Sequence, residues 1–387
     1  MFLTSPRKAL ILFGRPQSGK TTLTEYLFNC LSPESLSYSL TGFITKELRE
    51  GGERIGFDLV YLKDKTFRLP LARSTNKLSR SEAVKRPKVG KYALFPENLE
   101  KFVEILEKEV ASQENLLLFI DEIGKMESFS EKFVNFLSQL FEKNLKIVAT
   151  LGKGEHPLLK AWRSKKEAIY VEVTQENRDF LKERLLFEFL RPGKLIVFEG
   201  IDGAGKSTLF KALKQGLSKE NIVFSFEPTE GQYGKLLREI LKTKRADQET
   251  LLELFLKDRA EHVKNLLLPS LKAGKIVILD RYYLSTVAYQ GIHFKALFDL
   301  LSKNETFSPL PDIVFYLEIP IELALERIKG RNEGVSLFEK EELLNKISEN
   351  YERILPLFNH IRIKSDRPVE ELLQEVFIHL KAFIPQI

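Results

Sequence analysis

The sequence predicts an α/β protein of two domains, each a mainly parallel β-sheet flanked by helices. Two stretches carry this prediction, "GRPQSGKT" from Gly14 and "GIDGAGKST" from Gly200. Both fit G-x-x-x-x-G-K-[S/T], the pattern of a phosphate-binding loop, or P-loop. The third observation is that short apolar runs alternate with helical patterns along the 387 residues. The chain is long enough for two domains, each with its own core.

Composition predicts a globular protein of the cytoplasm. Apolar residues make up 43% and charged residues 29% of the chain, and no apolar run approaches the roughly 18 residues that span a bilayer. A single cysteine, Cys30, excludes an intramolecular disulfide and favours a reducing compartment. The net charge of +6 permits an anionic partner. No basic run is interleaved with aromatic residues, so no nucleic acid is expected as a partner. Without a spanning apolar run, no membrane is expected either.

In the first half, the apolar run "KALILF" precedes the P-loop and the helical pattern "KTTLTEYLFNCL" follows it. This strand, loop and helix order is the setting in which a P-loop binds phosphate, because backbone N–H groups and the helix dipole face the anion. Residues 116–120, 146–151 and 168–173 are apolar runs typical of buried parallel strands. The segment from Tyr38 to Arg73 has short alternating runs around "EGGERIG", which predict a β-hairpin insertion.

In the second half, "KLIVFEG" precedes the P-loop and "KSTLFKALKQGL" follows it. Further strands are predicted in "NIVFSF", "KIVILD", "DIVFYLEI" and "HIRIKS". The tripeptide "RPG" at 191–193 separates the halves, so the predicted domains are residues 1–191 and 192–387. Outside the P-loops the halves show no similarity, which indicates a fusion of two unlike domains.

The first candidate site is a nucleoside-triphosphate site. Lys20 is expected at the β- and γ-phosphates and Thr21 at Mg²⁺. Asp121 ends an apolar strand and is expected to hold the water shell of Mg²⁺, and Glu122 is placed to activate an attacking water. The predicted phosphate-binding residues of this loop are Gly14, Arg15, Pro16, Gln17, Ser18, Gly19, Lys20, Thr21 and Thr22.

Several stretches around this site resemble the small cancer-related nucleoside-triphosphatase family over nearly all of residues 8–188. They are "GFITKELREGGERIGF", "DEIGKME", "VAT", "HPL" and "TQENRD". The resemblance implies a RecA-like domain, similar to the cores of AAA+ ATPases, that hydrolyses the terminal phosphate of ATP, GTP and other nucleoside triphosphates. Lys125 and Arg178 match motif positions of the family. Each could stabilise charge in the transition state or form a surface ion pair.

The second candidate site repeats the phosphate and Mg²⁺ roles in Lys206 and Ser207. Asp280 ends the strand "KIVILD", where a carboxylate can hold Mg²⁺, and Arg281 follows as a phosphate clamp. The predicted phosphate-binding residues of this loop are Gly200, Ile201, Asp202, Gly203, Ala204, Gly205, Lys206, Ser207 and Thr208.

The stretches "FEPTEGQYGKLLRE", "LFLKDRAEHV", "DR" and "AYQ" resemble thymidylate kinase across essentially all of residues 194–382. That family transfers the γ-phosphoryl group of ATP to dTMP, giving dTDP. The resemblance implies that Phe255 stacks on thymine and that Arg259 donates to a base carbonyl. The other residues implied at the dTMP site are Asp202 at the 3′-hydroxyl, Arg238 and Arg281 at the acceptor phosphate, Tyr289 and Gln290 beside sugar and base, and Glu227 in the turn before Pro228.

The second P-loop has Gly203-Ala204 where one type of thymidylate kinase carries arginine, so the resemblance implies the type that uses arginines of a closing lid. Arg327 and Arg331 are the catalytic candidates in "LERIKGRNEGVSLFEKEELL". The chain departs from the family at Leu337, where an arginine is expected. This departure leaves the lid with less positive charge than the family pattern supplies.

The leading interpretation is a bifunctional enzyme with two independent sites, each using Mg²⁺ and the kinase using ATP as donor. One alternative is that the C-terminal half is a catalytically weak regulatory module that binds dTMP or dTTP. Another is that the N-terminal half is a nucleic-acid-stimulated ATPase. By analogy with thymidylate kinases, a homodimer through the C-terminal domain is expected.

Overall fold

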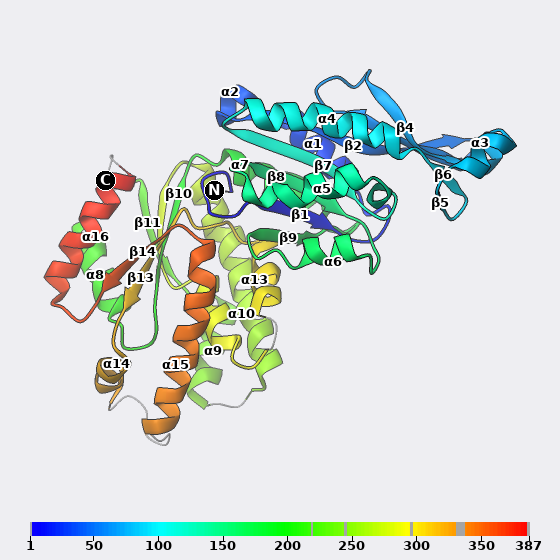
Figure 1. The fold of residues 1–387 in the computed structure, drawn as a ribbon. Helices are drawn as coiled ribbons and strands as arrows, with labels where there is room; N and C mark the ends of the chain where they lie inside the picture. Colours follow the sequence, from blue (N-terminus) through cyan, green and yellow to red (C-terminus); the bar gives the residue numbers. More distant parts are fainter. Residues whose placement is uncertain (1, 218–219, 244–245, 295–296, 330–336, 385–387) are drawn as a thin grey trace. The chain divides into compact units, whose positions relative to one another are not determined.

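The computed structural model describes residues 2–217, 220–243, 246–294, 297–329 and 337–384 (Figure 1). Its contacts divide the chain into two compact units. The N-terminal unit is Arg7–Leu190, and the C-terminal unit is Met1–Pro6 together with Arg191–Ile387. Within the described ranges, no helix is both long and apolar enough to cross a membrane.

The N-terminal unit contains a nine-stranded sheet in the order β5-β6-β4-β3-β2-β7-β8-β1-β9. The strands are β1 (Ala9–Phe13), β2 (Ser39–Glu50), β3 (Glu53–Tyr61), β4 (Arg68–Ser74), β5 (Lys88–Val89), β6 (Tyr92–Leu94), β7 (Leu116–Ile123), β8 (Lys146–Leu151) and β9 (Ala168–Glu172). The part β2-β7-β8-β1-β9 is parallel, which confirms the strands expected from the apolar runs. One strand, β8, lies between the P-loop strand β1 and the strand β7 that carries Asp121.

The other side of this sheet is antiparallel and begins with the predicted hairpin, β2 and β3. Its turn is Gly51-Gly52, where φ of +57° and +84° favours residues without a side chain. The strands β4, β6 and β5 extend the hairpin further. The strands β5 and β6 were not predicted, because two and three residues are too few to show an alternating pattern.

Helices cover the sheet of the N-terminal unit and enclose its core. They are α1 (Lys20–Cys30), α2 (Pro33–Leu36), α3 (Arg80–Lys85), α4 (Pro96–Ser112), α5 (Glu131–Gln139), α6 (Pro157–Arg163) and α7 (Arg178–Leu190). Phe43 of β2 packs edge-on against Phe102 of α4 and Phe133 of α5, with ring centroids 5.8 and 6.0 Å apart. This aromatic core fixes α4 and α5 on the sheet.

The C-terminal unit contains a parallel five-stranded sheet in the order β11-β12-β10-β13-β14. The strands are β10 (Lys194–Glu199), β11 (Ile222–Phe226), β12 (Ile276–Asp280), β13 (Ile313–Glu318) and β14 (His360–Lys364). The helices are α8 (Lys206–Gly216), α9 (Gln232–Thr243), α10 (Gln248–His262), α11 (Leu268–Lys272), α12 (Tyr283–Gln290), α13 (Leu297–Glu305), α14 (Ile321–Ile328), α15 (Leu337–Ile354) and α16 (Val369–Phe383). Here β10 and β12 are adjacent, so both phosphate-site motifs lie at the carboxyl end of the central strands.

The start of the chain belongs structurally to the C-terminal unit. Phe2 is 1% exposed, and the Asn359 side chain donates to the Thr4 carbonyl at 2.9 Å. Arg191 begins the second segment of this unit and forms a buried ion pair with Asp312 at 2.7 Å. Burial opposes ionisation of Asp312, yet the charge of Arg191 and a hydrogen bond from the Leu195 backbone hold the pKa of this carboxyl below its usual range.

Candidate functional sites

The P-loop of the N-terminal unit connects β1 to α1 and forms a cradle of backbone groups. Lys20 is buried, and its Nζ donates to the carbonyls of Gly14 and Arg15 at 3.4 and 3.3 Å. At Gly14, φ is +150° and a Cβ would lie 2.2 Å from the Val173 carbonyl oxygen, so only glycine fits. The loop therefore wraps the lysine and directs the N-terminus of α1 toward a phosphate site.

Asp121 lies at the end of β7, beyond a shift in its pairing with β8. Its carboxylate is fully buried and accepts hydrogen bonds from Thr150 Oγ1 at 2.5 Å and the Thr45 N–H at 3.4 Å. The Thr21 hydroxyl also bonds to it. Burial raises the pKa of Asp121, and these hydrogen bonds and the charge of Lys20 oppose the rise. The structure thus brings together Asp121 and Thr21, the two predicted Mg²⁺ ligands of this unit.

Glu122 follows Asp121 through a cis peptide bond and faces the P-loop lysine. Its carboxylate lies 3.9 Å from Lys20 Nζ, and its side chain is 36% exposed. Burial and the neighbouring Asp121 charge raise the pKa of Glu122 to about 7, against the attraction of Lys20. A partly exposed carboxylate with a pKa near neutrality suits proton abstraction from water.

Two glycines leave room for Glu122, and a second carboxyl faces it. A Cβ on Gly152 would lie 2.8 Å from Glu122 Oε1, and a Cβ on Gly124 would lie 3.1 Å from that oxygen and 2.7 Å from Glu127 Oε2. Glu127 is buried, and burial together with the charge of Glu122 raises its pKa well above the usual range. Glu127 was not among the predicted site residues, although it stands in the motif "DEIGKME".

The two basic residues singled out in this half occupy different surroundings. A Cβ on Gly19 would lie 3.2 Å from Arg178 Cδ, so the Arg178 side chain lies against the P-loop. Lys125 is exposed and forms no ion pair with the residues that the structure describes. Of the two, Arg178 is the one placed to reach phosphate charge.

The P-loop of the C-terminal unit connects β10 to α8 and holds its lysine in the same way. Lys206 is 5% exposed, and its Nζ donates to the carbonyls of Gly200 and Ile201 at 2.8 and 2.7 Å. Burial and the nearby Arg281 charge lower the pKa of Lys206 to about 7. Bound phosphate oxygens would favour the charged form of this amine.

Ser207 and Asp280, the predicted Mg²⁺ ligands of this unit, are in direct contact. Ser207 Oγ donates to Asp280 Oδ2 at 3.0 Å. Asp280 Oδ1 is buried and has no hydrogen-bond partner among the described residues. A buried carboxylate oxygen without a partner suits a hard cation such as Mg²⁺. The described residues contain no group of three His, Cys, Asp or Glu that could hold a metal alone, so a nucleotide would complete the ligand set.

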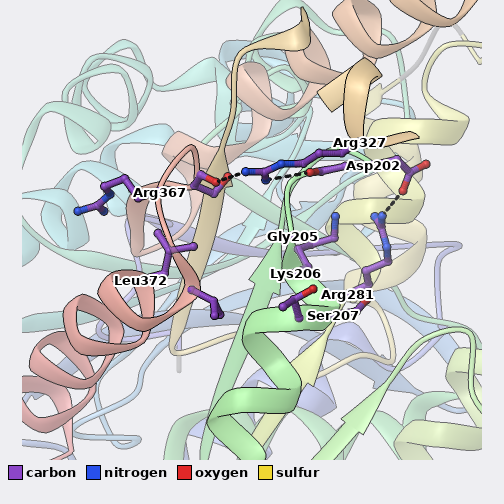
Figure 2. Close-up of a pocket in the computed structure, with 12 residues that line it drawn as sticks. Asp202, Gly205, Lys206, Ser207, Arg281, Arg327, Arg367 and Leu372 are labelled. Atoms are coloured by element: carbon purple, nitrogen blue, oxygen red, sulfur yellow. Dashed lines mark hydrogen bonds and ion pairs between the residues drawn. The ribbon is translucent and has the colours of Figure 1, made fainter. Parts of the chain in front are cut away.

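Arg281 follows Asp280 and turns back over the P-loop. Figure 2 shows it beside Asp202, Lys206 and Ser207. Its Nη2 donates to Asp202 Oδ1 at 2.5 Å and to the Tyr289 hydroxyl at 3.4 Å, and its guanidinium lies 5.3 Å from the centre of the Tyr289 ring. At Arg281 φ is +67°, a conformation uncommon for side chains of this size.

A buried carboxylate fixes the turn that carries Arg281. Glu199 accepts hydrogen bonds from the backbone N–H groups of Tyr282 and Ser285 at 2.9 and 3.2 Å. It also accepts from the hydroxyls of Ser285 at 2.5 Å and Tyr351 at 2.8 Å. No local pattern predicts this role of Glu199, because its partners lie 83 to 152 residues further along the chain.

Arg259 is engaged inside the protein. Its Nε and Nη2 donate to Glu227 Oε2 at 2.9 and 2.6 Å, Nη2 donates to Thr286 Oγ1 at 2.9 Å, and Nη1 donates to Asn304 Oδ1 at 2.5 Å. Four of the five guanidinium N–H groups are thus taken. At most one remains for the base carbonyl that the resemblance implied, and that contact stays a prediction.

The Glu227 carboxylate also binds a histidine that sequence analysis did not single out. His262 Nδ1 lies 3.0 Å from Glu227 Oε1, and its Nε2 lies 2.8 Å from Ser225 Oγ. Burial opposes ionisation of Glu227, but Arg259 and His262 hold its pKa below the usual range. The peptide bond between Glu227 and Pro228 is cis. A continuous buried network therefore shapes the turn after β11.

The other residues expected at a dTMP site lie around this network. Phe255 is half-buried against a small cluster that includes Leu237 and Leu251. Gln290 is 6% exposed, and its Oε1 has no hydrogen-bond partner among the described residues. Arg238 donates to the Pro228 carbonyl at 2.8 Å and pairs with Glu230. Gln290 thus offers an unsatisfied acceptor for a ligand donor group.

A cavity of about 470 Å³ opens beside this P-loop. Arg327 of α14 lines it and donates to the carbonyls of Gly203 and Ser365 at 3.3 and 3.2 Å (Figure 2). Arg367 also lines the cavity, and sequence analysis did not single it out. Arg331 and the side chain of Leu337, the other predicted lid positions, lie outside the part of the chain that the structure describes.

Comparison with known proteins agrees with two P-loop families in one chain. Residues 198–376 match the family described as "Thymidylate kinase", and residues 9–186 match the family described as "NTPase". The thymidylate kinase of Desulfotalea psychrophila is 40% identical over 198 residues, covering 50% of this chain and 96% of the relative. That of Akkermansia muciniphila is 50% identical over 153 residues, covering 39% and 74%. A probable thymidylate kinase of Thermococcus onnurineus is 40% identical over 182 residues, covering 43% and 87%.

Proposed function

The chain belongs to the thymidylate kinase family through its C-terminal half and to the NTPase family through its N-terminal half, and we propose on this premise that it is a bifunctional nucleotide enzyme. The C-terminal site transfers the γ-phosphoryl group of ATP to dTMP, giving dTDP. The N-terminal site hydrolyses ATP, GTP and other nucleoside triphosphates to diphosphate and phosphate.

The kinase proposal depends above all on the arrangement of Asp280 and Arg281. The Asp280 carboxylate accepts from Ser207 through Oδ2, while its Oδ1 has no hydrogen-bond partner among the described residues. Arg281 donates to the Gly200 carbonyl of the same loop. Magnesium bound there would neutralise charge on the donor phosphates. Lys206 would hold the β- and γ-phosphates, and Arg281, with Arg238, would bind the acceptor phosphate. Donor and acceptor charges would thus meet in one site.

Selectivity for dTMP is proposed to come from residues around the buried network of Glu227, Arg259 and His262. Gln290 Oε1 has no hydrogen-bond partner within the described ranges, and Arg259 has at most one N–H left to donate. The half-buried ring of Phe255 offers a face for stacking, and Asp202 could accept from the sugar hydroxyl when Arg281 turns to phosphate. A site built on such polar pairs rejects a base that leaves them unmade.

Transition-state charge in the kinase would be met by Arg327. Its guanidinium already touches the Gly203 carbonyl of the P-loop, and a Cβ on Gly205 would lie 3.6 Å from Arg327 Nη1. A small shift toward the γ-phosphate would exchange a carbonyl partner for phosphoryl oxygens. Arg331 is proposed as a second lid cation.

The hydrolase proposal depends on Glu122 facing Lys20 at 3.9 Å. Lys20 would hold the triphosphate, Asp121 and Thr21 would hold Mg²⁺, and Glu122 would take a proton from the attacking water. Arg178, which lies against the P-loop, would stabilise the negative charge of the γ-phosphoryl group while water attacks it.

The two sites can be separated by one assay on the full chain. The protein is incubated with Mg²⁺ and ATP, with and without dTMP, and dTDP and free phosphate are measured independently for the wild type, Lys20→Ala and Lys206→Ala. Loss of dTDP only in Lys206→Ala, and of dTMP-independent phosphate release only in Lys20→Ala, supports two enzymes. Phosphate release that survives Lys20→Ala refutes the hydrolase site.

A second candidate for the C-terminal half follows from Leu337, which stands where the family pattern has arginine. The half could be a regulatory module that binds dTMP or dTTP with little turnover. Calorimetric binding of dTMP by a protein that forms no dTDP would favour this alternative over the kinase.

A homodimer through the C-terminal unit is proposed from the family resemblance. Leu236 and Leu241 of α9 are 41% and 46% exposed, so apolar surface is available in this unit. Light scattering on the eluted protein should give twice the chain mass of 44.7 kDa. With one free cysteine, Cys30, the proposed compartment is the cytoplasm.

A further inference from the structure

One segment of the N-terminal unit carries the net charge of the whole chain. Residues 63–91 contain ten Lys and Arg but two Asp and Glu, whereas all other residues contain 50 Lys and Arg and 52 Asp and Glu. The segment runs through β4, α3 and β5. The basic character of the protein is therefore local and belongs to the outer, antiparallel part of one sheet.

The fold gathers part of this segment into a compact surface, here called the basic tip and defined as residues 77–91. Lys77 and Lys91 pair with Glu50 and Glu53 at 2.5 and 2.7 Å, which holds the tip against the turn between β2 and β3. Figure 1 shows α3, β5 and β6 grouped beyond the end of β4. Cations separated in sequence thereby share one end of the unit.

Three cations of the basic tip have no counterion in the part of the chain that the structure describes. Arg80, Lys85 and Lys88 are exposed and form no ion pair with any residue in the described ranges. The single acidic residue of the tip, Glu82, accepts hydrogen bonds from the Ser79 N–H and hydroxyl at 3.2 and 2.6 Å. Unpaired like charges repel one another in the free protein, and a polyanion would relieve that repulsion.

The surroundings of these cations favour a phosphate backbone over other anionic partners. Residues 77–91 contain no aromatic residue. The flanking ring of Phe95 is covered by the Arg86 guanidinium at 3.8 Å, and Tyr92 packs edge-on against Phe57. Bases of a single strand would thus find no ring on which to stack. Val84 is the only exposed large apolar side chain among residues 77–91, all of which the structure describes. The tip therefore has no apolar face that could insert into a lipid surface.

We propose that the basic tip binds the phosphate backbone of a nucleic-acid duplex without reading its sequence. The proposal departs from the expectation drawn from the sequence, where no nucleic acid was expected because no basic run is interleaved with aromatic residues. It is independent of the two proposed reactions, because the tip contains none of the residues assigned to either phosphate site.

The test is fluorescence anisotropy of the full chain with a labelled DNA duplex, a matched RNA duplex and the corresponding single strand, over a series of KCl concentrations. The test variant is R80Q/K85Q/K88Q. The matched control is K101Q/K108Q/K143Q, which removes the same charge from exposed lysines of the same unit. Both variants should retain the circular dichroism spectrum and the melting temperature of the wild type, which shows that they are folded.

The wild type and the control should bind duplex with steep salt dependence. If all three cations contact phosphates, the test variant should bind on the order of 100-fold more weakly at 0.1 M salt, and its log–log salt slope should fall by about 3. The DNA and RNA arms show which duplex is preferred, and binding to either supports the proposal. Equal losses in test and control variants, tighter binding to the single strand, or binding only to polyglutamate or to anionic vesicles would overturn it.

Discussion

Replacing Arg259 by alanine should destabilise the C-terminal unit and not merely weaken dTMP binding. In the structure Arg259 is 1% exposed and gives four hydrogen bonds to Glu227, Thr286 and Asn304. Its removal leaves the buried Glu227 carboxylate with His262 as its remaining side-chain partner. Breaking a buried ion pair by removing one member costs about 3–5 kcal/mol. For a unit of this size, the melting midpoint should fall by about 6–20 °C.

The assay is differential scanning calorimetry of the full chain, which has two units and need not unfold in one step. The transition that dTMP shifts upward identifies the C-terminal unit. His262→Ala is the matched comparison, because it removes one hydrogen-bond partner of the same Glu227 carboxylate and should cost only about 1–3 kcal/mol. If Arg259→Ala melts like the wild type and only dTMP affinity falls, Arg259 is a ligand contact and the network has no stabilising role.

Three further changes test other parts of the structure. Glu122→Gln should lower dTMP-independent phosphate release by about 10²–10⁴-fold at unchanged nucleotide affinity. In the wild type, the rate of this release should decrease as the pH is lowered through about 7, because Glu122 then takes up a proton. A rate that does not change with pH would contradict the assignment of Glu122 as the base. Gly14→Ala should abolish nucleotide binding in the N-terminal unit, measured with a fluorescent analogue in a Lys206→Ala background, because its Cβ would lie 2.2 Å from the Val173 carbonyl. Phe2→Ala should lower the free energy of unfolding of the C-terminal unit by about 3–5 kcal/mol, because Phe2 is 1% exposed, and the midpoint of the dTMP-shifted transition should fall accordingly. A shift confined to the other transition would refute the place of Phe2 in this unit.

The strands were predictable because buried parallel strands are continuous apolar runs. "LLLFI" and "KIVILD" are examples, and they became parts of β7 and β12. The strands β5 and β6 were not predictable, because two or three residues show no periodicity. The place of Phe2 in the C-terminal unit was also hidden, because a terminal apolar residue does not indicate which core it enters.

The phosphate-site residues could be proposed because each lies within a short local pattern. Lys20, Lys206 and the strand-end carboxylates Asp121 and Asp280 are of this kind. The supporting residues could not be proposed in this way. Glu199 and Glu227 owe their roles to partners that are distant in the chain, such as Tyr351 and Arg259, and only the fold brings these together.

The residue after the strand-end aspartate distinguishes the two sites chemically. In the N-terminal unit it is Glu122, a carboxylate that faces Lys20 and can accept a proton from water. In the C-terminal unit it is Arg281, a cation that stands over the P-loop and can hold an anionic acceptor. The carboxylate would repel a phosphate acceptor, and the guanidinium cannot act as a base because it stays protonated. One chain can therefore carry two P-loops without redundancy, because a reversal of charge at this position suits one loop to water and the other to a phosphate.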